Sequence, residues 1–363
     1  MNIAYQALCN LPLVLLSILG LGFLVMFHEL GHFLFAKLFN VYAPTFSIGF
    51  GPQILKKKIG DTNFVISAIP LGGYVELAGS PEVGQGEQLH AKDTSERSFN
   101  RKPYWQKLLI IAGGILFNLI FAYAAFSYLL YVGAPFCTGE QCNTLAPVVA
   151  TVIPGSKADK AQLKANDKIV SINNQRVQTI AEFKKELEPL ADKTVALTVE
   201  RQGQEQPIAV EVGSQTVDGK KTPVLEISWS TPPLGFTDAL KEGFSTTWAW
   251  ILKTFNALKG IVKSRDSLGG PLLIITTITK CAGVGFKMFL FMLAFISVNL
   301  AVFNVLPLPI FDGGQVLFFT IEALLGRPLS DETRHTIHYY TWLGLIALVI
   351  YLTYKDILKL AGW

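Results

Sequence analysis

Long apolar runs alternate with polar stretches along the chain. Four of the runs have the length and polarity of a membrane-spanning helix, which needs roughly 20 apolar residues. They lie at about residues 11–38, 108–132, 286–305 and 341–354. The last run is short, and tyrosine and tryptophan residues flank it, as is typical of the membrane–water interface. The pattern predicts a multi-pass α-helical membrane protein with about four spans.

The connections between the runs have a different pattern. Residues 46–51 and 63–75 alternate between apolar and polar positions and contain glycine turns, so they predict β-hairpins. Residues 133–234 contain several alternating segments and one amphipathic helix, which predicts an α+β domain outside the membrane. Residues 235–285 begin as an amphipathic segment that is expected to lie on the membrane surface.

Composition agrees with this division and excludes several classes of protein. Only 16% of the 363 residues are charged, whereas soluble domains have about 25%. The net charge of +4 is small and no basic stripe with interleaved aromatic residues occurs, so we expect no nucleic-acid partner. None of the four cysteines forms a Cys-x-x-Cys pair, which argues against a cysteine zinc site. Cys137 and Cys142 could form a local disulfide or remain two thiols, and the sequence leaves both open.

The distribution of basic residues predicts the orientation in the membrane. Loops rich in lysine and arginine near span ends stay on the cytoplasmic side. Residues 39–107 are such a loop, and residues 306–340 carry two arginines. We therefore expect both segments on the cytoplasmic side, with the termini and the α+β domain outside. Two lysines near the C-terminal end weakly favour the opposite orientation.

Three ionisable residues, His28, Glu29 and His32, lie inside the first apolar run. Such residues are costly in a membrane helix and usually functional. Residues i and i+4 share one helix face, so both imidazoles can bind one metal ion while Glu29 reaches a water on it. Zinc in such a site lowers the pKa of water, and the carboxylate carries protons. The alternative, two surface histidines with a solvated glutamate, is too costly in an apolar helix.

A catalytic zinc site needs a third protein ligand. Asp312 follows the third apolar run, after Pro307 and Pro309 interrupt the helix. Non-helical backbone at membrane depth is tolerated only inside protein or beside water, which makes Asp312 a candidate ligand. It could equally be a turn residue or the N-cap of a helix that starts near Gln315. The other histidines are expected to be exposed or interfacial: His90, His335 and His338.

Two motifs together resemble the site-2 protease family of intramembrane zinc metalloproteases, and most closely its bacterial regulator-of-sigma-E members. One is the H-E-x-x-H segment, and the other is the N-x-x-P-x-P-x-x-D-G segment that starts at Asn304. The resemblance implies that His28, His32 and Asp312 hold Zn²⁺ and that Glu29 is the general acid/base. It also implies that Asn304 contacts substrate. Iron or cobalt also fits such a ligand set, so zinc follows from the resemblance.

Two further segments fit the same family. The second run contains a Gly-x-x-x-Asn motif that ends at Asn118, which could bond a substrate backbone or pack against another helix. The hairpin region is similar to a membrane-dipping sheet that pairs with an extended substrate by strand addition. Its expected substrate-binding edge comprises Gly72, Gly73, Tyr74 and Val75.

Residues 146–230 resemble one bacterial PDZ domain, which would bind a peptide or act as a size filter. The resemblance to the site-2 protease family implies regulated intramembrane proteolysis of single-span proteins, such as an anti-sigma factor or a signal-peptide remnant. It places the enzyme in the bacterial inner membrane, with the active site toward the cytoplasm. The predicted segments are 1–38 with the H-E-x-x-H motif, 39–107 with the hairpins, 108–132, 133–234 with the PDZ domain, 235–285, 286–305, 306–340 with the third ligand, and 341–363.

Two other functions explain less of the sequence. A transporter could line an ion path with the same residues, but transporters usually contain repeated sets of spans, and none is detectable here. An inactive scaffold that displays a PDZ domain would be expected to have lost Glu29 or a metal ligand, and both are present. The sequence therefore favours the zinc endopeptidase.

Overall fold

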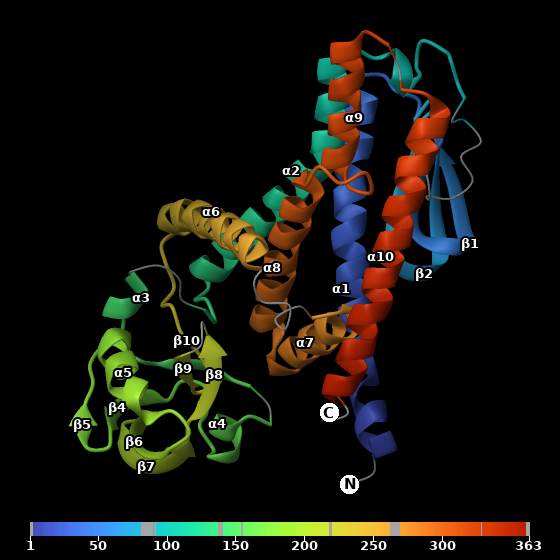
Figure 1. The fold of residues 1–363 in the computed structure, drawn as a ribbon. Helices are drawn as coiled ribbons and strands as arrows, with labels where there is room; N and C mark the ends of the chain where they lie inside the picture. The colour runs from blue at the N-terminus through green and yellow to red at the C-terminus, as the bar shows by residue number, and fades with distance from the viewer. Residues whose placement is uncertain are drawn as a thin grey trace. The chain divides into compact units, whose positions relative to one another are not determined.

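A computed structural model describes residues 3–80, 90, 92–136, 141–153, 155–217, 220–261, 269–327 and 329–360. The chain forms two compact units (Figure 1). The first unit comprises residues 1–122, 247–279 and 293–363, and the second comprises residues 123–246 and 280–292. The first contains the H-E-x-x-H segment and the hairpins, and the second contains the α+β domain.

Four helices in the described part of the chain are long and apolar enough to cross a membrane. They are α1 (Ile3–Leu38), α2 (Tyr104–Tyr131), α8 (Phe286–Val305) and α10 (Asp331–Leu360). The prediction of a multi-pass helical membrane protein is therefore confirmed. Three further helices are α6 (Phe236–Ile261), α7 (Pro271–Val284) and α9 (Asp312–Leu325).

The prediction for the last span was wrong at its start, because α10 begins at Asp331 and not near residue 341. The Ser330 hydroxyl accepts a hydrogen bond from the Thr333 N–H (3.2 Å) and caps the helix there. The first turns of α10 are polar but helical, whereas hydropathy marks only the apolar part of a helix. Residues 306–340, predicted as a metal-ligand loop and a cytoplasmic segment, contain α9 and the start of α10.

The predicted membrane-surface segment, residues 235–285, contains the two helices α6 and α7, and its position at the membrane surface stays a prediction. Asp356 of α10 accepts hydrogen bonds from the Gly270 and Leu273 N–H groups, both at 2.9 Å. These are groups at the start of α7 that have no partner within the helix, so Asp356 acts as its cap. Helix α7 has 14 residues, which is too short for an independent span.

Strands β1 (Thr45–Ile59) and β2 (Thr62–Glu76) form an antiparallel sheet beside α1 (Figure 1). The first part of β1 pairs on both sides: Phe46 lies opposite Phe64 on one side and Val75 on the other. The end of β2 is therefore an edge strand. It lies against α1, because a Cβ added to Gly22 would come within 2.2 Å of the Pro70 carbonyl oxygen.

Helices α1 and α2 also approach closely. A Cβ added to Gly31 would lie 2.2 Å from the Gly113 carbonyl oxygen, so the two backbones touch. Small residues at such a crossing are typical of membrane helix pairs. An apolar cluster that includes Phe33, Phe46 and Ile110 joins α1, β1 and α2. Together these contacts bring α2 and the sheet against the part of α1 that carries the histidines.

The second unit contains the α+β domain. Its four-stranded sheet has the order β5-β4-β6-β7, and two further strand pairs are β10-β3 and β8-β9. The strands are β3 (Val149–Val152), β4 (Lys168–Ile172), β5 (Gln175–Arg176), β6 (Thr194–Arg201), β7 (Gln204–Glu211), β8 (Gly213–Val217), β9 (Lys220–Val224) and β10 (Ile227–Trp229). The helices are α3 (Gln141–Thr144), α4 (Lys157–Lys160) and α5 (Ile180–Leu187).

Local sequence explains the main helix of this domain. In α5 the buried residues Ile180, Phe183 and Leu187 follow helical spacing, and the Thr179 hydroxyl accepts the Glu182 N–H (3.2 Å) as an N-cap. Cys142 of α3 is disulfide-bonded. The other cysteine of that loop, Cys137, lies outside the described residues.

A buried ion pair holds β4 and β6 together. The Asp167 carboxylate is fully buried, and Arg201 donates to it from Nε and Nη2, both at 2.7 Å. Burial alone would raise the pKa of Asp167. Hydrogen bonds from Arg201 and the Lys164 N–H outweigh burial, so this pKa is lowered below its ordinary value of 3.8.

Arg201→Met is expected to destabilise the domain by roughly 3–5 kcal/mol, because it leaves a buried carboxylate without its cationic partner. In the wild type, the lowered pKa makes Asp167 stabilising above pH 3.8, and this contribution is lost as the pH falls further. In the variant the pKa of Asp167 rises, so protonation begins at a higher pH. Hydrogen exchange of β4 and β6 between pH 4 and 7 measures both effects. Arg176→Met, at an exposed arginine of β5, is the control and should leave exchange unchanged.

Candidate metal centre and active site

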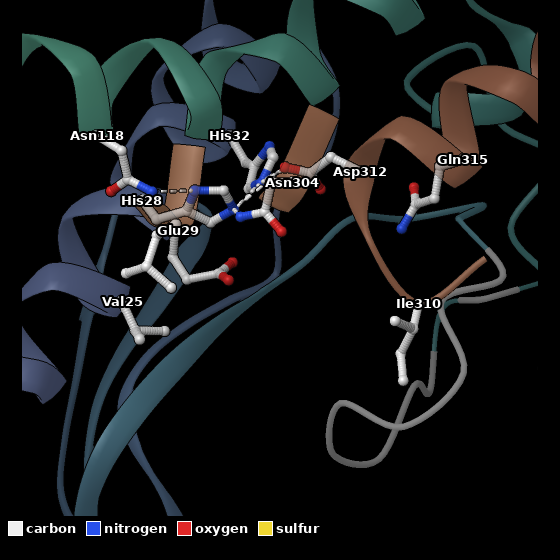
Figure 2. A pocket seen from close by; sticks show the side chains of 10 residues that line it. Val25, His28, Glu29, His32, Asn118, Asn304, Ile310, Asp312 and Gln315 are labelled. Atoms are coloured by element: carbon white, nitrogen blue, oxygen red, sulfur yellow. Dashed lines mark hydrogen bonds and ion pairs between the residues drawn. The ribbon is translucent and has the colours of Figure 1, made fainter. Parts of the chain in front are cut away.

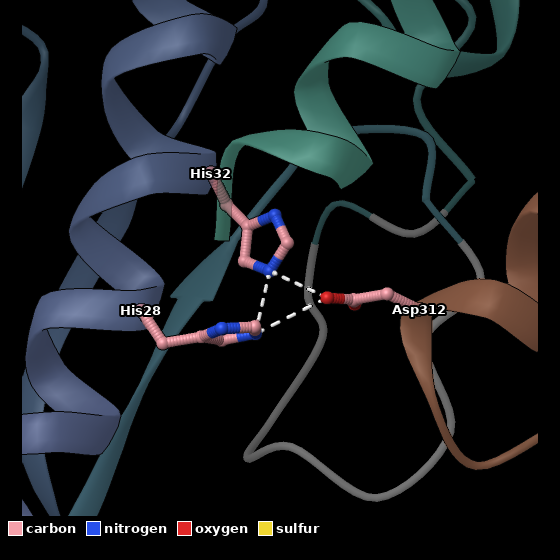
Figure 3. Close-up of side chains that lie close together, drawn as sticks. All are labelled: His28, His32 and Asp312. Carbon is pink, nitrogen blue, oxygen red and sulfur yellow. Dashed lines mark hydrogen bonds and ion pairs between the residues drawn. The ribbon is translucent and has the colours of Figure 1, made fainter. Parts of the chain in front are cut away.

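Three side chains from α1 and α9 converge on one point. Within the described residues, His28, His32 and Asp312 form a group whose ligand atoms all lie within 4.8 Å of one another. The two Nε2 atoms are 3.1 Å apart, and Asp312 Oδ2 lies 3.2 Å from that of His28 and 3.5 Å from that of His32. Figure 3 shows both imidazoles pointing from α1 toward the carboxylate.

The chain around Asp312 turns sharply because of its prolines and glycines. Helix α8 ends at Val305, and a Cβ added to Gly313 would lie 2.3 Å from the Val305 carbonyl oxygen. Only glycine permits this approach. Phe311 occupies the N-cap position and α9 begins at Asp312 itself. The alternative in which Asp312 caps a helix starting near Gln315 is therefore wrong.

The hydrogen bonds of His28, His32 and Asp312 leave ligand atoms available for a zinc ion. The His32 Nδ1 atom lies 2.9 Å from the Ile110 carbonyl oxygen, which accepts its proton and leaves Nε2 with a free lone pair. Asp312 Oδ2 is buried and makes no hydrogen bond to any described residue. The His32 lone pair, His28 Nε2 and a buried carboxylate oxygen meet at one point, where a shared cation fits. Two histidines and one carboxylate are a common ligand set of catalytic zinc.

Helix α2 leaves space for both imidazoles. A Cβ added to Gly114 would lie 2.5 Å from His32 Nε2 and 2.6 Å from His28 Cε1, so no other residue fits without displacing them. The Asn118 amide nitrogen lies 3.1 Å from His28 Nδ1. The Asn304 amide nitrogen lies 3.5 Å from His28 Nε2. Both asparagines singled out in the sequence thus lie beside the same histidine.

Glu29 lies next to the histidines and borders the same cavity. The cavity has a volume of about 190 Å³, and its lining includes Glu29, Asn304 and Gln315 (Figure 2). Glu29 is buried, and its Oε2 accepts a hydrogen bond from the Val75 N–H of β2 (3.2 Å). A carboxylate is therefore fixed at the metal-ligand group in a space large enough for several water molecules, each of which occupies about 30 Å³.

The predicted edge residues lie on β2, just before Val75, whose N–H contacts Glu29. They are not among the residues that line the cavity. Gly72 has φ +130°, a conformation that only glycine adopts readily. A Cβ added to Gly73 would lie 2.5 Å from the Ser47 carbonyl oxygen. The Tyr74 ring stacks on Phe50 with a centroid distance of 6.3 Å. These residues fix the path of the edge strand.

One expectation about the other histidines was wrong. His338 is buried and packs on the Phe318 ring at 5.6 Å, because that face of α10 contacts α9. His90 is partly exposed as expected, and its Nδ1 lies 3.0 Å from the Glu76 carboxylate. The side chain of His335 lies outside the described residues. Val75 was expected on the edge strand, but the bond from its N–H to Glu29 was not predicted, and neither was the Ile110 carbonyl beside His32. Main-chain groups have no signal in residue identity.

Two imidazoles and a carboxylate around one point, with a second carboxylate beside them, define a metal-dependent hydrolase of the H-E-x-x-H class. Residues 16–349 match the family model of peptidase family M50. The chain belongs to that family and is a zinc metalloendopeptidase of the site-2 protease type, which confirms the resemblance and the zinc cofactor.

Relatives of similar length support this assignment. A protein of Campylobacter jejuni is 32% identical, over 96% of this chain and 94% of its own length. Zinc metalloprotease RasP of Geobacillus kaustophilus is 26% identical, over 96% of this chain and 99% of its own. A solved PDZ domain of an SdrC-like protein from Listeria monocytogenes matches 24% of this chain at 18% identity, with a TM-score of 0.21.

Proposed function

We propose that this metalloprotease hydrolyses peptide bonds within or near the transmembrane segments of single-span proteins. One observation carries the proposal: His28, Glu29 and His32 are buried on α1, an apolar helix long enough to span a membrane, and the buried Asp312 of α9 meets the two histidines there. A site at that depth reaches peptide bonds that a soluble protease does not. The class of substrate implied by the resemblance, an anti-sigma factor or a signal-peptide remnant, agrees with such a site.

In this mechanism His28, His32 and Asp312 hold the zinc ion. When bound, zinc supplies a Lewis acid that activates water and the scissile carbonyl. Glu29 takes the proton of the attacking water and delivers it to the leaving amine. The Asn304 amide borders the cavity and donates to the substrate backbone.

We propose that substrate binds as a strand along the edge at Gly72, Gly73 and Tyr74. The same edge continues to Val75, whose N–H contacts Glu29, so an added strand would pass directly by the catalytic carboxylate. Strand addition uses main-chain hydrogen bonds. A helical substrate hides those groups, so a segment must unwind before cleavage.

Contacts along α1 support a membrane-dipping sheet. At the turn between β1 and β2, Asp61 pairs with Lys37 in the last turn of α1. At the other end of the hairpin, the Pro70 carbonyl touches Gly22. Since a helix rises about 1.5 Å per residue, the hairpin extends roughly 20 Å along α1, from the end of the span toward its middle. Exposed isoleucines on it would face lipid.

The depth of the hairpin predicts different labelling at two exposed positions. Ile59, near the turn, is 56% exposed and Ile69, near Gly22, is 47% exposed. In membranes, a water-soluble maleimide is expected to label Ile59→Cys rapidly and Ile69→Cys poorly, because only the second lies at hydrocarbon depth. In denaturing detergent both should react alike. Equal labelling in membranes would argue against the membrane-dipping sheet, and the wild type measures background from its own cysteines.

The remaining proposals concern location. The enzyme lies in the bacterial inner membrane with residues 39–107 and the active site toward the cytoplasm, as the basic residues favour. The PDZ-like domain lies outside, where it limits the size of substrate ectodomains or binds a peptide. We favour the size filter, because Trp229 of β10 packs on Phe183 of α5 at 5.1 Å and so occupies space between a strand and the helix.

The test of the proposed function uses the full chain in lipid nanodiscs with zinc and a single-span substrate. Mass spectrometry of the products locates the cut. A cut within the substrate span, lost with a chelator and restored by zinc, is expected. Cleavage confined to soluble loops of the substrate would overturn the proposal.

A further inference from the structure

We propose that Asn118 is a positioning residue that fixes the tautomer and orientation of His28 for metal binding. This rests on the proposed role of His28 as a zinc ligand. It replaces both roles that the sequence suggested for Asn118, a substrate contact and a plain helix–helix contact. Figure 2 shows the Asn118 side chain reaching from α2 to the imidazole.

The amide of Asn118 is almost fully buried and has one unpaired atom. The residue is 1% exposed, and its nitrogen lies 3.1 Å from His28 Nδ1. Its oxygen, Oδ1, is buried and has no hydrogen-bond partner in the described part of the chain. The main chain at this position is fixed too, because the Asn118 carbonyl accepts the Ser297 hydroxyl of α8 (2.8 Å).

Metal binding decides which amide atom faces His28. The Nε2 atom of His28 faces Asp312 and His32, so its lone pair must be free for the metal. A neutral imidazole then carries its proton on Nδ1, and this N–H needs an acceptor. An amide nitrogen cannot accept, whereas Oδ1 can. A half-turn of the Asn118 amide exchanges its two nearly equivalent atoms and gives the unpaired oxygen the Nδ1 proton.

The neighbouring histidine has the same arrangement on the same helix. His32 Nδ1 is hydrogen-bonded to the Ile110 carbonyl. Ile110 lies two turns before Asn118 in α2, and Gly114 lies midway between them on the same helix face. That glycine leaves room for both rings. One face of α2 therefore orients both ligands, with a carbonyl for His32 and a side chain for His28. This accounts for the Gly-x-x-x-Asn motif without substrate.

The test measures zinc affinity of the full chain by competition with a chelator, without substrate. Asn118→Leu removes the acceptor and is expected to lower zinc affinity by about 10–100-fold, the usual effect of losing such a partner. Asn118→Asp has the same shape and only acceptor atoms, so it should stay within a few-fold of the wild type. The absorption spectrum of the Co²⁺-substituted protein should change in the leucine variant and be preserved in the aspartate variant.

Ser297→Ala is the matched control, since it removes the bond to the Asn118 main chain and leaves the amide in place. It should bind zinc like the wild type. Wild-type zinc affinity in Asn118→Leu, or an equal loss in Asn118→Asp, would overturn the inference. Because no substrate is present, the result is independent of the proposed function: the variants could behave as expected while single-span substrates remain uncut.

Discussion

Replacing Glu29 with glutamine is expected to abolish hydrolysis while zinc remains bound. Glutamine has the shape of glutamate and can still accept the Val75 N–H through its amide oxygen. It cannot take a proton from water, and loss of a general base costs about 10²–10⁴-fold in rate. The cleavage rate of a single-span substrate and the zinc content of the purified protein measure the two halves of this prediction.

A second buried glutamate provides the control. Glu76 accepts a hydrogen bond from the Thr45 hydroxyl (3.0 Å), and its carboxylate lies 3.0 Å from His90 Nδ1. Glu76→Gln removes a buried carboxylate from the same sheet but leaves the metal group untouched, so it should retain cleavage. Hydrolysis that survives in Glu29→Gln would exclude the proposed mechanism. Loss of zinc in that variant would instead give Glu29 a role in holding the metal.

The residues of the candidate metal group could be singled out from the sequence because each has a local signal. His28 and His32 are one helical turn apart in an apolar run, where ionisable groups are costly. Asp312 lies in a segment whose prolines and glycines interrupt a span. These features depend only on neighbouring residues, so no knowledge of the fold was needed to find them.

Other parts of the site depend on contacts between distant segments. The partners of Glu29 and His32 are the main-chain groups of Val75 and Ile110, which any residue could supply. Asn118 has a polar side chain, but only the packing of α2 on α1 shows that it faces His28. His338 was misjudged for the same reason, since helix contacts decide its burial.

The fold was predictable to a similar extent. Hydropathy located the membrane helices, because a bilayer selects apolar residues directly. It misplaced the start of α10, where the capping residue Ser330 sets the boundary and the first turns are polar. The double pairing of β1 could not be predicted, because the alternating pattern shows a strand and does not show its partners.

Replacing Asp312 with asparagine is expected to release zinc and thereby abolish hydrolysis. The amide keeps the shape but loses the negative charge that balances the ion in a buried site, where unscreened charge interactions are strong. Removing a direct ligand should cost more zinc affinity than the 10–100-fold that is usual for an outer contact. Metal content after dialysis and chelator competition measure the loss.

Asp356→Asn separates the loss of zinc from general destabilisation. Asp356 is also a buried aspartate, and it accepts hydrogen bonds from the N–H groups at the start of α7. Its loss should cost roughly 0.5–2 kcal/mol of stability, as for other helix caps, with zinc affinity unchanged. Zinc retained in Asp312→Asn would mean that another group, with Glu29 the nearest carboxylate in the cavity, is the third ligand. Glu29→Gln and Asp312→Asn thus form a pair. Only a base at residue 29 and a ligand at residue 312 predict lost hydrolysis in both variants and lost zinc in the second alone.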